Sequence, residues 1–208
     1  QNYIMVVPGA NYMLSKQDID ECLPSLKDSY IVGFQLENNF DVVEYAIERI
    51  SEMGVRILLD PAPARPIPDD LYKCIHIIKP NEHEAEILTG IRVVDTKSAE
   101  KAGRWFVEKG VDISIITLGK NGAVLVTRDQ TRHFPAIYLK PVDTTGAGDC
   151  FSGALMAALS RGSSIEDAII FANCASAISV TRLGVVEALP ELSEINELFE
   201  KVKEGDLI

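Results

Sequence analysis

The run DTTGAGD, residues 143–149, places two acidic residues around a turn that has almost no side chains, and an apolar helical pattern follows directly. The first amides of a helix lack intrahelical partners and lie at the positive end of the helix dipole, so small residues there let a phosphate approach. Asp149 then lies beside the bound group, where its carboxylate can accept the proton of an attacking hydroxyl. Alternatively, the same residues only cap the following helix.

Short apolar runs alternate with amphipathic helical patterns along most of the chain. Strands that are buried on both faces of a parallel sheet have such runs, and the alternation implies crossover helices on both sides of the sheet. We therefore predict strands at residues 3–7, 30–36, 55–59, 75–78 and 113–118. The clearest helices are expected at residues 42–53 and 98–109, and three more are expected to finish the chain at residues 148–160, 164–181 and 192–203.

The pattern changes after Gly122. Residues 123–126 and 137–139 are typical of two antiparallel strands, and residues 128–130 form the turn that we place between them. The predicted fold class is α/β, a three-layer α/β/α arrangement with a mostly parallel central sheet. Residues 1–208 are expected to form one domain.

The composition excludes several classes of protein. A formal net charge of −11 argues against a nucleic-acid partner, which needs a basic stripe. The apolar runs are too short to span a membrane. The cysteines show neither paired spacing nor zinc-ligand spacing, so a reduced, cytoplasmic protein is the default: Cys22, Cys74, Cys150 and Cys174.

Two further motifs follow predicted strands. Residues 79–84 come after the strand at 75–78, and Asn81 with Glu84 is either a helix capping box or part of a ligand site. Residues 117–122 follow the apolar residues 113–116, and alone they could be an ordinary tight hairpin. Ligands of open α/β sheets bind beyond the carboxyl ends of the strands. Three such motifs therefore favour a shared nucleotide crevice over three unrelated turns.

The DTTGAGD run, the Asn81–Glu84 element and the 117–122 turn resemble the signatures of the ribokinase-like (PfkB) sugar and nucleoside kinases. They occur in the same order at compatible spacing, and the resemblance covers essentially the whole chain. Residues 9–11, 60–65 and 180–184 are most similar to the ribokinases within that family.

The resemblance implies ATP-dependent phosphorylation of the primary hydroxyl of ribose. The alternatives are a fructokinase, a nucleoside kinase, or a catalytically inactive nucleotide-binding fragment. A Rossmann-type oxidoreductase fits less well, because no GxGxxG motif follows the first predicted strand.

The resemblance also implies roles for individual residues. Asp149 would be the catalytic base and would contact the sugar. Glu37 would be a second residue in contact with the sugar. The anion hole would consist of the amides of Gly146, Ala147 and Gly148. The nucleotide and Mg²⁺ would be held by Asn81, Glu84, Thr117, Gly119, Gly122 and Asn173.

Ribokinases use a monovalent cation, K⁺, that orders the anion hole. Asp143 would supply the full negative charge of this site. The further oxygens would come from Thr145, Ser179, Arg182 and Gly184. One departure is visible, because this chain has Ala188 where ribokinases usually carry a serine.

Ribokinases also begin with roughly a hundred further residues that carry sugar-binding glycines, an aspartate and a β-strand lid. This chain opens at Gln1, almost inside a predicted strand. We therefore expect it to be the C-terminal part of a longer protein, homodimeric when complete. The isolated part, with an unpaired sheet edge, is expected to bind ATP weakly and not to phosphorylate ribose.

Overall fold

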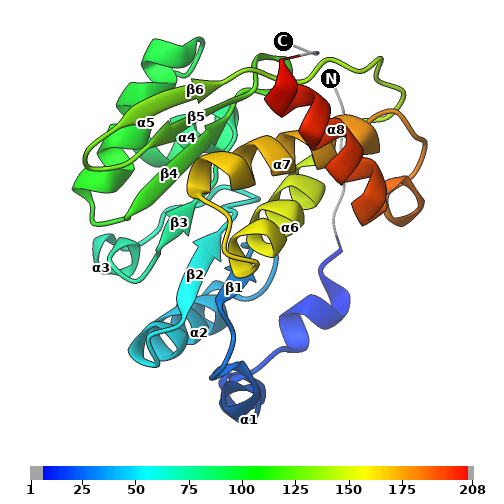
Figure 1. The fold of residues 1–208 in the computed structure, drawn as a ribbon. Helices are drawn as coiled ribbons and strands as arrows, with labels where there is room; N and C mark the ends of the chain where they lie inside the picture. Colours follow the sequence, from blue (N-terminus) through cyan, green and yellow to red (C-terminus); the bar gives the residue numbers. More distant parts are fainter. Residues whose placement is uncertain (1–6, 206–208) are drawn as a thin grey trace.

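One six-stranded sheet forms the centre of the computed structural model, which describes residues 7–205 (Figure 1). The strands lie side by side in the order of the sequence. The first four are parallel to one another, and the fifth pairs antiparallel with both the fourth and the sixth. They are β1 (Ile31–Phe34), β2 (Arg56–Leu59), β3 (Ile77–Ile78), β4 (Ile113–Thr117), β5 (Ala123–Val126) and β6 (Thr131–Phe134).

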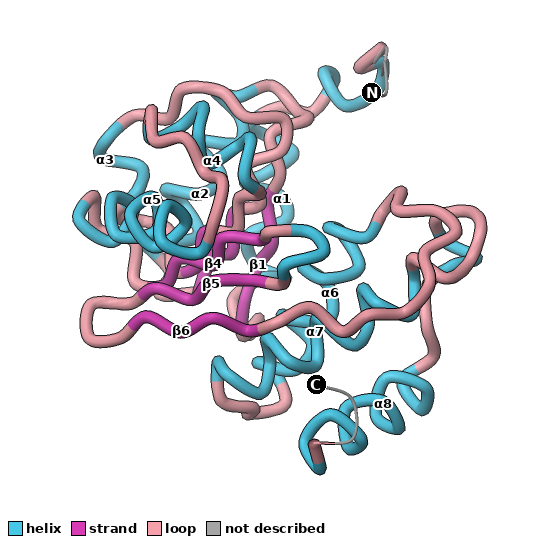
Figure 2. The backbone as a smooth tube through the Cα atoms, turned by 90° about the horizontal axis from the view of Figure 1, so that it is seen from above, coloured by secondary structure: helices cyan, strands magenta, loops and turns pink. Residues whose placement is uncertain are grey.

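Helices cover both faces of this sheet, as the view turned by 90° shows (Figure 2). One face packs against α2 (Phe40–Glu52), α3 (Asp69–Tyr72), α4 (Glu82–Thr89) and α5 (Thr96–Glu108). The other packs against α6 (Ala147–Ser160), α7 (Ile165–Ser179) and α8 (Leu192–Glu204). A further helix, α1 (Lys16–Leu26), lies against α2. The structure thus confirms the predicted three-layer α/β fold.

The strands divide two hydrophobic cores between the faces. In β2, Ile57 and Leu59 belong to the core beneath α2 to α5, whereas Leu58 belongs to the core beneath α6 to α8. All three side chains are almost fully buried. Successive strand residues point to opposite faces, so a sheet covered on both sides needs apolar residues at consecutive positions. This requirement explains the unbroken apolar runs of the sequence.

Most predicted elements occur within a few residues of their expected positions, but the last strand was misplaced. The strand that pairs with β5 is β6 at Thr131–Phe134, where Thr131 lies opposite Val126. Residues 137–139 instead lie in the loop before α6, where Ile137 and Leu139 pack against the core beneath α6 to α8. The prediction followed apolar character, whereas the short turn at 128–130 sets the pairing immediately after it.

Two other differences concern the first part of the chain. The strand predicted at 3–7 falls almost entirely on residues 1–6, outside the described part. The helix α1 was not predicted, although Ser15 and Asp18 form a capping box at its start. Among the described residues, no helix is long and apolar enough to cross a membrane.

Close packing of α5 on the sheet depends on Gly103. A Cβ atom at this position would lie 2.5 Å from Cγ2 of Val126 in β5. Gly103→Ala is therefore expected to lower the free energy of unfolding by about 1–3 kcal/mol, because the methyl group overpacks the core. Urea denaturation monitored by circular dichroism measures this change.

Gly153 in α6 is the matched control. No atom lies within 4 Å of a Cβ placed there, so Gly153→Ala is expected to raise the free energy of unfolding by about 0.5–1 kcal/mol. Equal shifts in both variants would show that the helix–sheet distance at Gly103 does not limit side-chain size.

Candidate active site

The carboxyl ends of β1 to β4 and the start of α6 enclose a cleft of about 570 Å³. Most of the predicted site residues line this cleft, although they come from distant parts of the sequence. They are Glu37, Asn81, Glu84, Thr117, Gly119, Gly122, Ala147, Gly148, Asp149 and Asn173. Gly146 lies next to them and lines a neighbouring apolar pocket together with Asp149.

The first turn of α6 reaches the cleft without a side-chain cap. Its N-cap residue is Gly146, which has φ +75° and has no side chain to satisfy the first amides. Asp149 lies in the first turn, where the helix dipole favours negative charge. An uncapped helix start that faces a cleft can bind an anion through its amides.

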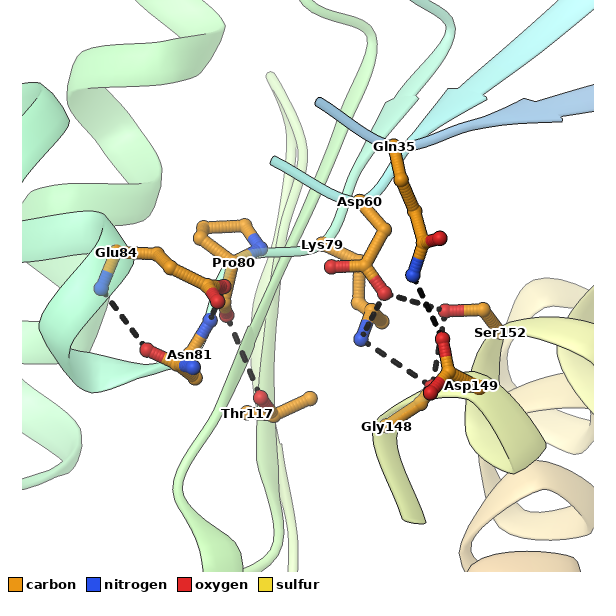
Figure 3. A network of polar contacts seen from close by, with 10 residues as sticks. All are labelled: Gln35, Asp60, Lys79, Pro80, Asn81, Glu84, Thr117, Gly148, Asp149 and Ser152. Carbon is orange, nitrogen blue, oxygen red and sulfur yellow. Dashed lines mark hydrogen bonds and ion pairs between the residues drawn. The ribbon is translucent and has the colours of Figure 1, made fainter. Parts of the chain in front are cut away.

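Asp149 is held by a residue that the sequence analysis missed. The side-chain amide of Gln35, directly after β1, donates a 2.6 Å hydrogen bond to Oδ1 of Asp149 (Figure 3). Gln35 donates to Oδ1 only, so Oδ2 of Asp149 is the oxygen that can accept a proton from a substrate. Gln35 fell inside the strand predicted at residues 30–36, and the one signal that could have identified it is its polar side chain near the carboxyl end of that apolar run.

A buried ion pair lies behind the start of α6. Nζ of Lys79 is 2.8 Å from Oδ2 of Asp60, and these side chains are 4% and 7% exposed. Nζ of Lys79 also donates to the carbonyl oxygen of Gly148 at 3.4 Å, and Oγ of Ser152 lies 3.0 Å from both that carbonyl and Asp60 (Figure 3). Asp60 and Lys79 both lie in motifs that are visible in the sequence, but no local pattern predicts that they pair.

Asn81 and Glu84 form the capping box that the sequence suggested. Oδ1 of Asn81 accepts from the amide of Glu84 at 2.9 Å, and the amide of Asn81 donates to Oε2 of Glu84 at 2.8 Å. Burial raises the pKa of Glu84, an effect that the hydrogen bond from Asn81 partly offsets. The capping role does not exclude a ligand role, because both residues also line the cleft.

The 117–122 turn borders the same cleft. The amide of Thr117 donates to the carbonyl of Pro80 at 3.0 Å, which ties this turn to the Asn81–Glu84 element. Gly122 has φ +87°, and a Cβ there would lie 1.9 Å from the carbonyl oxygen of Phe134. Only glycine fits this position, so Gly122 has a structural role whatever ligand binds nearby.

A second pocket of about 280 Å³ continues from the cleft between α7 and the loop after β6. It shares Gly119, Ala147, Asn173 and Ser176 with the cleft. Its other walls are mainly apolar, including Ile137 and Val180. A mainly apolar slot with few polar groups suits a flat heterocyclic base.

The residues predicted to hold a cation also come together. Oδ1 of Asp143 accepts from the amide and hydroxyl of Thr145 at 3.0 and 2.7 Å, and Oδ2 accepts from the amide of Gly184 at 3.4 Å. The bonds from Thr145 and Gly184 lower the pKa of Asp143, which therefore stays charged. The amide of Asp143 donates to the carbonyl of Val180 at 3.2 Å, close to Ser179 in sequence.

Two side chains near this set have no oxygen to offer a cation. Arg182 pairs with Glu194 through its guanidinium, which is itself cationic and has no acceptor atom, so only the backbone carbonyl of Arg182 is suited to a cation. Ala188 is buried and offers no hydroxyl. Within residues 7–205, no three His, Cys, Asp or Glu side chains are grouped to hold a metal, so a cation here would depend mainly on backbone oxygens.

Known proteins resemble this chain over almost its whole length. Residues 1–192 match the family described as pfkB family carbohydrate kinase. The ribokinase of Haemophilus influenzae is 38% identical over 200 residues, which cover 96% of this chain and 65% of that protein. The deoxyribokinase of Salmonella typhi is 39% identical over 197 residues, which cover 94% of this chain and 64% of that protein.

Solved structures of similar proteins have the same fold. The ribokinase of Arabidopsis thaliana was solved in complex with ribose and ATP. It has a TM-score of 0.87 against this chain, with 28% sequence identity. The match covers 96% of this chain and 65% of that structure. The chain thus spans slightly less than two thirds of the length of these relatives.

Proposed function

Because this chain belongs to the pfkB family of carbohydrate kinases, we propose that it carries the phosphoryl-transfer part of an ATP-dependent sugar kinase that phosphorylates ribose. The observation that carries this proposal is the position of Asp149. Its carboxylate lies in the first turn of an uncapped helix, in the same cleft as Asn81 and Glu84. The base and the phosphate-binding groups are therefore within one site.

In the proposed reaction, Asp149 accepts the proton of the primary hydroxyl while the hydroxyl oxygen bonds to the γ-phosphorus of ATP. The bond between that phosphorus and the bridging oxygen breaks, and ADP leaves with the bond electrons. The amides of Gly146, Ala147 and Gly148 donate to the oxygens of the transferred phosphoryl group. The products are ribose 5-phosphate and ADP.

The nucleotide would extend from the start of α6 into the apolar slot beside Asn173. Thr117, Gly119 and Gly122 would border its phosphates and ribose. The side-chain oxygens of Asn81 and Glu84 suit Mg²⁺, a hard cation that binds oxygen ligands. When bound, Mg²⁺ neutralises phosphate charge during transfer.

A second sugar competes with ribose as the proposed phosphoryl acceptor. Glu37 lines the cleft close in sequence to Gln35, and we propose that it contacts the sugar. The Salmonella typhi relative is a deoxyribokinase of similar identity, which makes 2-deoxyribose the second candidate. We also propose a cytoplasmic protein that forms homodimers, with neither nucleic acid nor membrane as a partner.

The test uses the protein that contains residues 1–208, with ATP and Mg²⁺, in a coupled assay of ADP release. Ribose is expected to give a higher kcat/KM than 2-deoxyribose, fructose or adenosine. A preference for one of the others would replace ribose as the acceptor, whereas no turnover with any of them would refute a sugar or nucleoside kinase. Titration of the isolated 208-residue chain with ATP detects the weak binding that we expect without turnover.

Activation by K⁺ is a separate prediction. The Asp143 carboxylate, with carbonyl oxygens of Ser179, Arg182 and Gly184 and an oxygen of Thr145, would bind the cation. We expect turnover in K⁺ to exceed turnover in Na⁺ or in tetramethylammonium by about tenfold, because the cation orders the loop that precedes the anion hole. Steady-state assays at constant ionic strength measure this ratio. Identical rates in all three salts would rule out the site.

A further inference from the structure

We propose that the buried Asp60–Lys79 ion pair, together with Ser152, positions the anion hole by holding the first turn of α6 through the carbonyl of Gly148. This inference deepens the proposed function and rests on it. It assigns a positioning role to three side chains that make no direct contact with a substrate in the proposed reaction. Figure 3 shows them between the sheet and the start of α6.

The sheet places the two charges with little freedom. The amide of Asp60 donates to the carbonyl of Phe34 at 2.8 Å, and the amide of Lys79 donates to the carbonyl of Leu59 at 2.9 Å. Both residues thus continue the parallel hydrogen-bond pattern one step beyond β2 and β3. The pairing of Leu59 with Ile78 brings the following residues, Asp60 and Lys79, next to each other.

The contacts of the pair point to α6. The ammonium of Lys79 donates to the carbonyl of Gly148, and the hydroxyl of Ser152 lies 3.0 Å from both this carbonyl and the carboxylate of Asp60. The three side chains therefore join the edge of the sheet to the first two turns of the helix. The N-cap Gly146 has no side chain that could do so instead.

A purely structural role does not explain why this ion pair is buried, because burying two charges costs free energy. Buried ion pairs contribute little or no net stability compared with apolar groups of similar size, because both charges lose their hydration. Asp60, Lys79 and Gly148 all line the cleft, whereas the rest of the sheet is held by apolar cores. A rigid link at this point is useful where amides must keep their aim on a reacting group.

The experiment removes the link without leaving an unpaired charge. The variant Asp60→Asn/Lys79→Met replaces both ionic groups by neutral groups of similar size, so its melting temperature is expected to recover most of the loss shown by Lys79→Met alone. The matched control is Asp69→Asn/Lys109→Met. It neutralises a pair with a 2.6 Å contact between α3 and the end of α5, away from the cleft.

Two measurements separate positioning from stability. In the protein that contains this chain, the Asp60→Asn/Lys79→Met variant is expected to lose at least about 30-fold in kcat with less than about threefold change in KM for ATP. In hydrogen exchange followed by mass spectrometry, peptides from residues 143–152 should exchange at least about fivefold faster, while peptides from α5 and β4 stay unchanged. The control variant should change neither quantity.

The inference would be overturned if the double variant kept kcat within threefold of the parent value. Unchanged exchange at residues 143–152 would overturn it as well. The exchange measurement needs no turnover, so an inactive parent protein would refute the kinase proposal and still leave the positioning test decisive. If the double variant does not fold, Ser152→Ala provides the test, because it removes one hydroxyl only. It should raise exchange in the same peptides at least twofold, and unchanged exchange there would also overturn the inference.

Discussion

Replacing Asp149 by asparagine is expected to lower kcat by about 10²–10⁴-fold, the usual contribution of a general base, while ATP still binds within about threefold of the parent affinity. Asparagine keeps the size of the side chain and can still accept the hydrogen bond from Gln35, which is 2.6 Å long in the parent. It cannot accept the proton of the acceptor hydroxyl. The coupled ADP assay measures kcat, and calorimetric titration measures ATP binding.

Asp112→Asn is the control for the same chemical change elsewhere. Asp112 directly precedes β4, at the end of the sheet opposite the cleft, where its carboxylate contacts His76 at 2.7 Å. This variant should keep kcat within about twofold, as expected for an exposed surface pair. A similar small effect in Asp149→Asn would show that another group, or water, takes the proton.

Gln35 makes the assignment of the base more specific. If Gln35 acts through Asp149, then Gln35→Ala should lower kcat in the parent and have no further effect in the Asp149→Asn background. Such complete non-additivity is typical of residues that work as a unit. Independent, multiplicative losses would mean that Gln35 acts elsewhere, for example on the sugar.

The second large effect is expected from Gly148→Ala, because it separates the two interpretations of the DTTGAGD run. An added Cβ at Gly148 would have Nζ of Lys79 as its nearest neighbour, at 3.6 Å, which is an ordinary contact. The folded protein therefore has room for the methyl group. If the amides bind the phosphoryl group, the same methyl group obstructs its approach, and kcat/KM should fall by about 10²–10³-fold.

If the run only caps the helix, Gly148→Ala should be harmless to turnover and should stabilise α6 by about 0.5–1 kcal/mol. Gly153→Ala, further along the same helix, is the matched control, and it should leave kcat/KM within twofold. Urea denaturation of both variants shows whether stability changes in parallel. Full activity of Gly148→Ala would rule out the anion hole at this position.

Gly146 cannot serve for this test. Its φ of +75° is strained for any other residue, and a Cβ there would lie 2.9 Å from Cγ1 of Val185. Gly146→Ala would therefore change the loop and the helix start together. The backbone therefore requires glycine at position 146, whereas it does not at position 148, where we propose that the ligand does.

Most of the sheet could be predicted because it is buried on both faces. A strand such as β2 must be apolar at consecutive positions, and this local pattern is visible without any knowledge of its neighbours. The same pattern misled the prediction at residues 137–139, which are apolar because they pack beside the α6–α8 core as a loop. The turn at residues 128–130 determines which residues pair with β5. The residues of β6 are mostly exposed and polar, so no apolar pattern predicts this strand.

The candidate site divides in the same way. Helix starts, glycine turns and the Asn81–Glu84 capping box depend on residues within a few positions of one another, so the order of residues alone was sufficient to predict them. The contacts of Gln35 with Asp149 and of Asp60 with Lys79 join segments that are far apart in the sequence. They exist only because neighbouring strands align in register and α6 docks onto their ends. That alignment is a property of the packed sheet, which is why local patterns indicated the turn that we propose binds phosphate, while the contacts that support this turn became visible only in the folded chain.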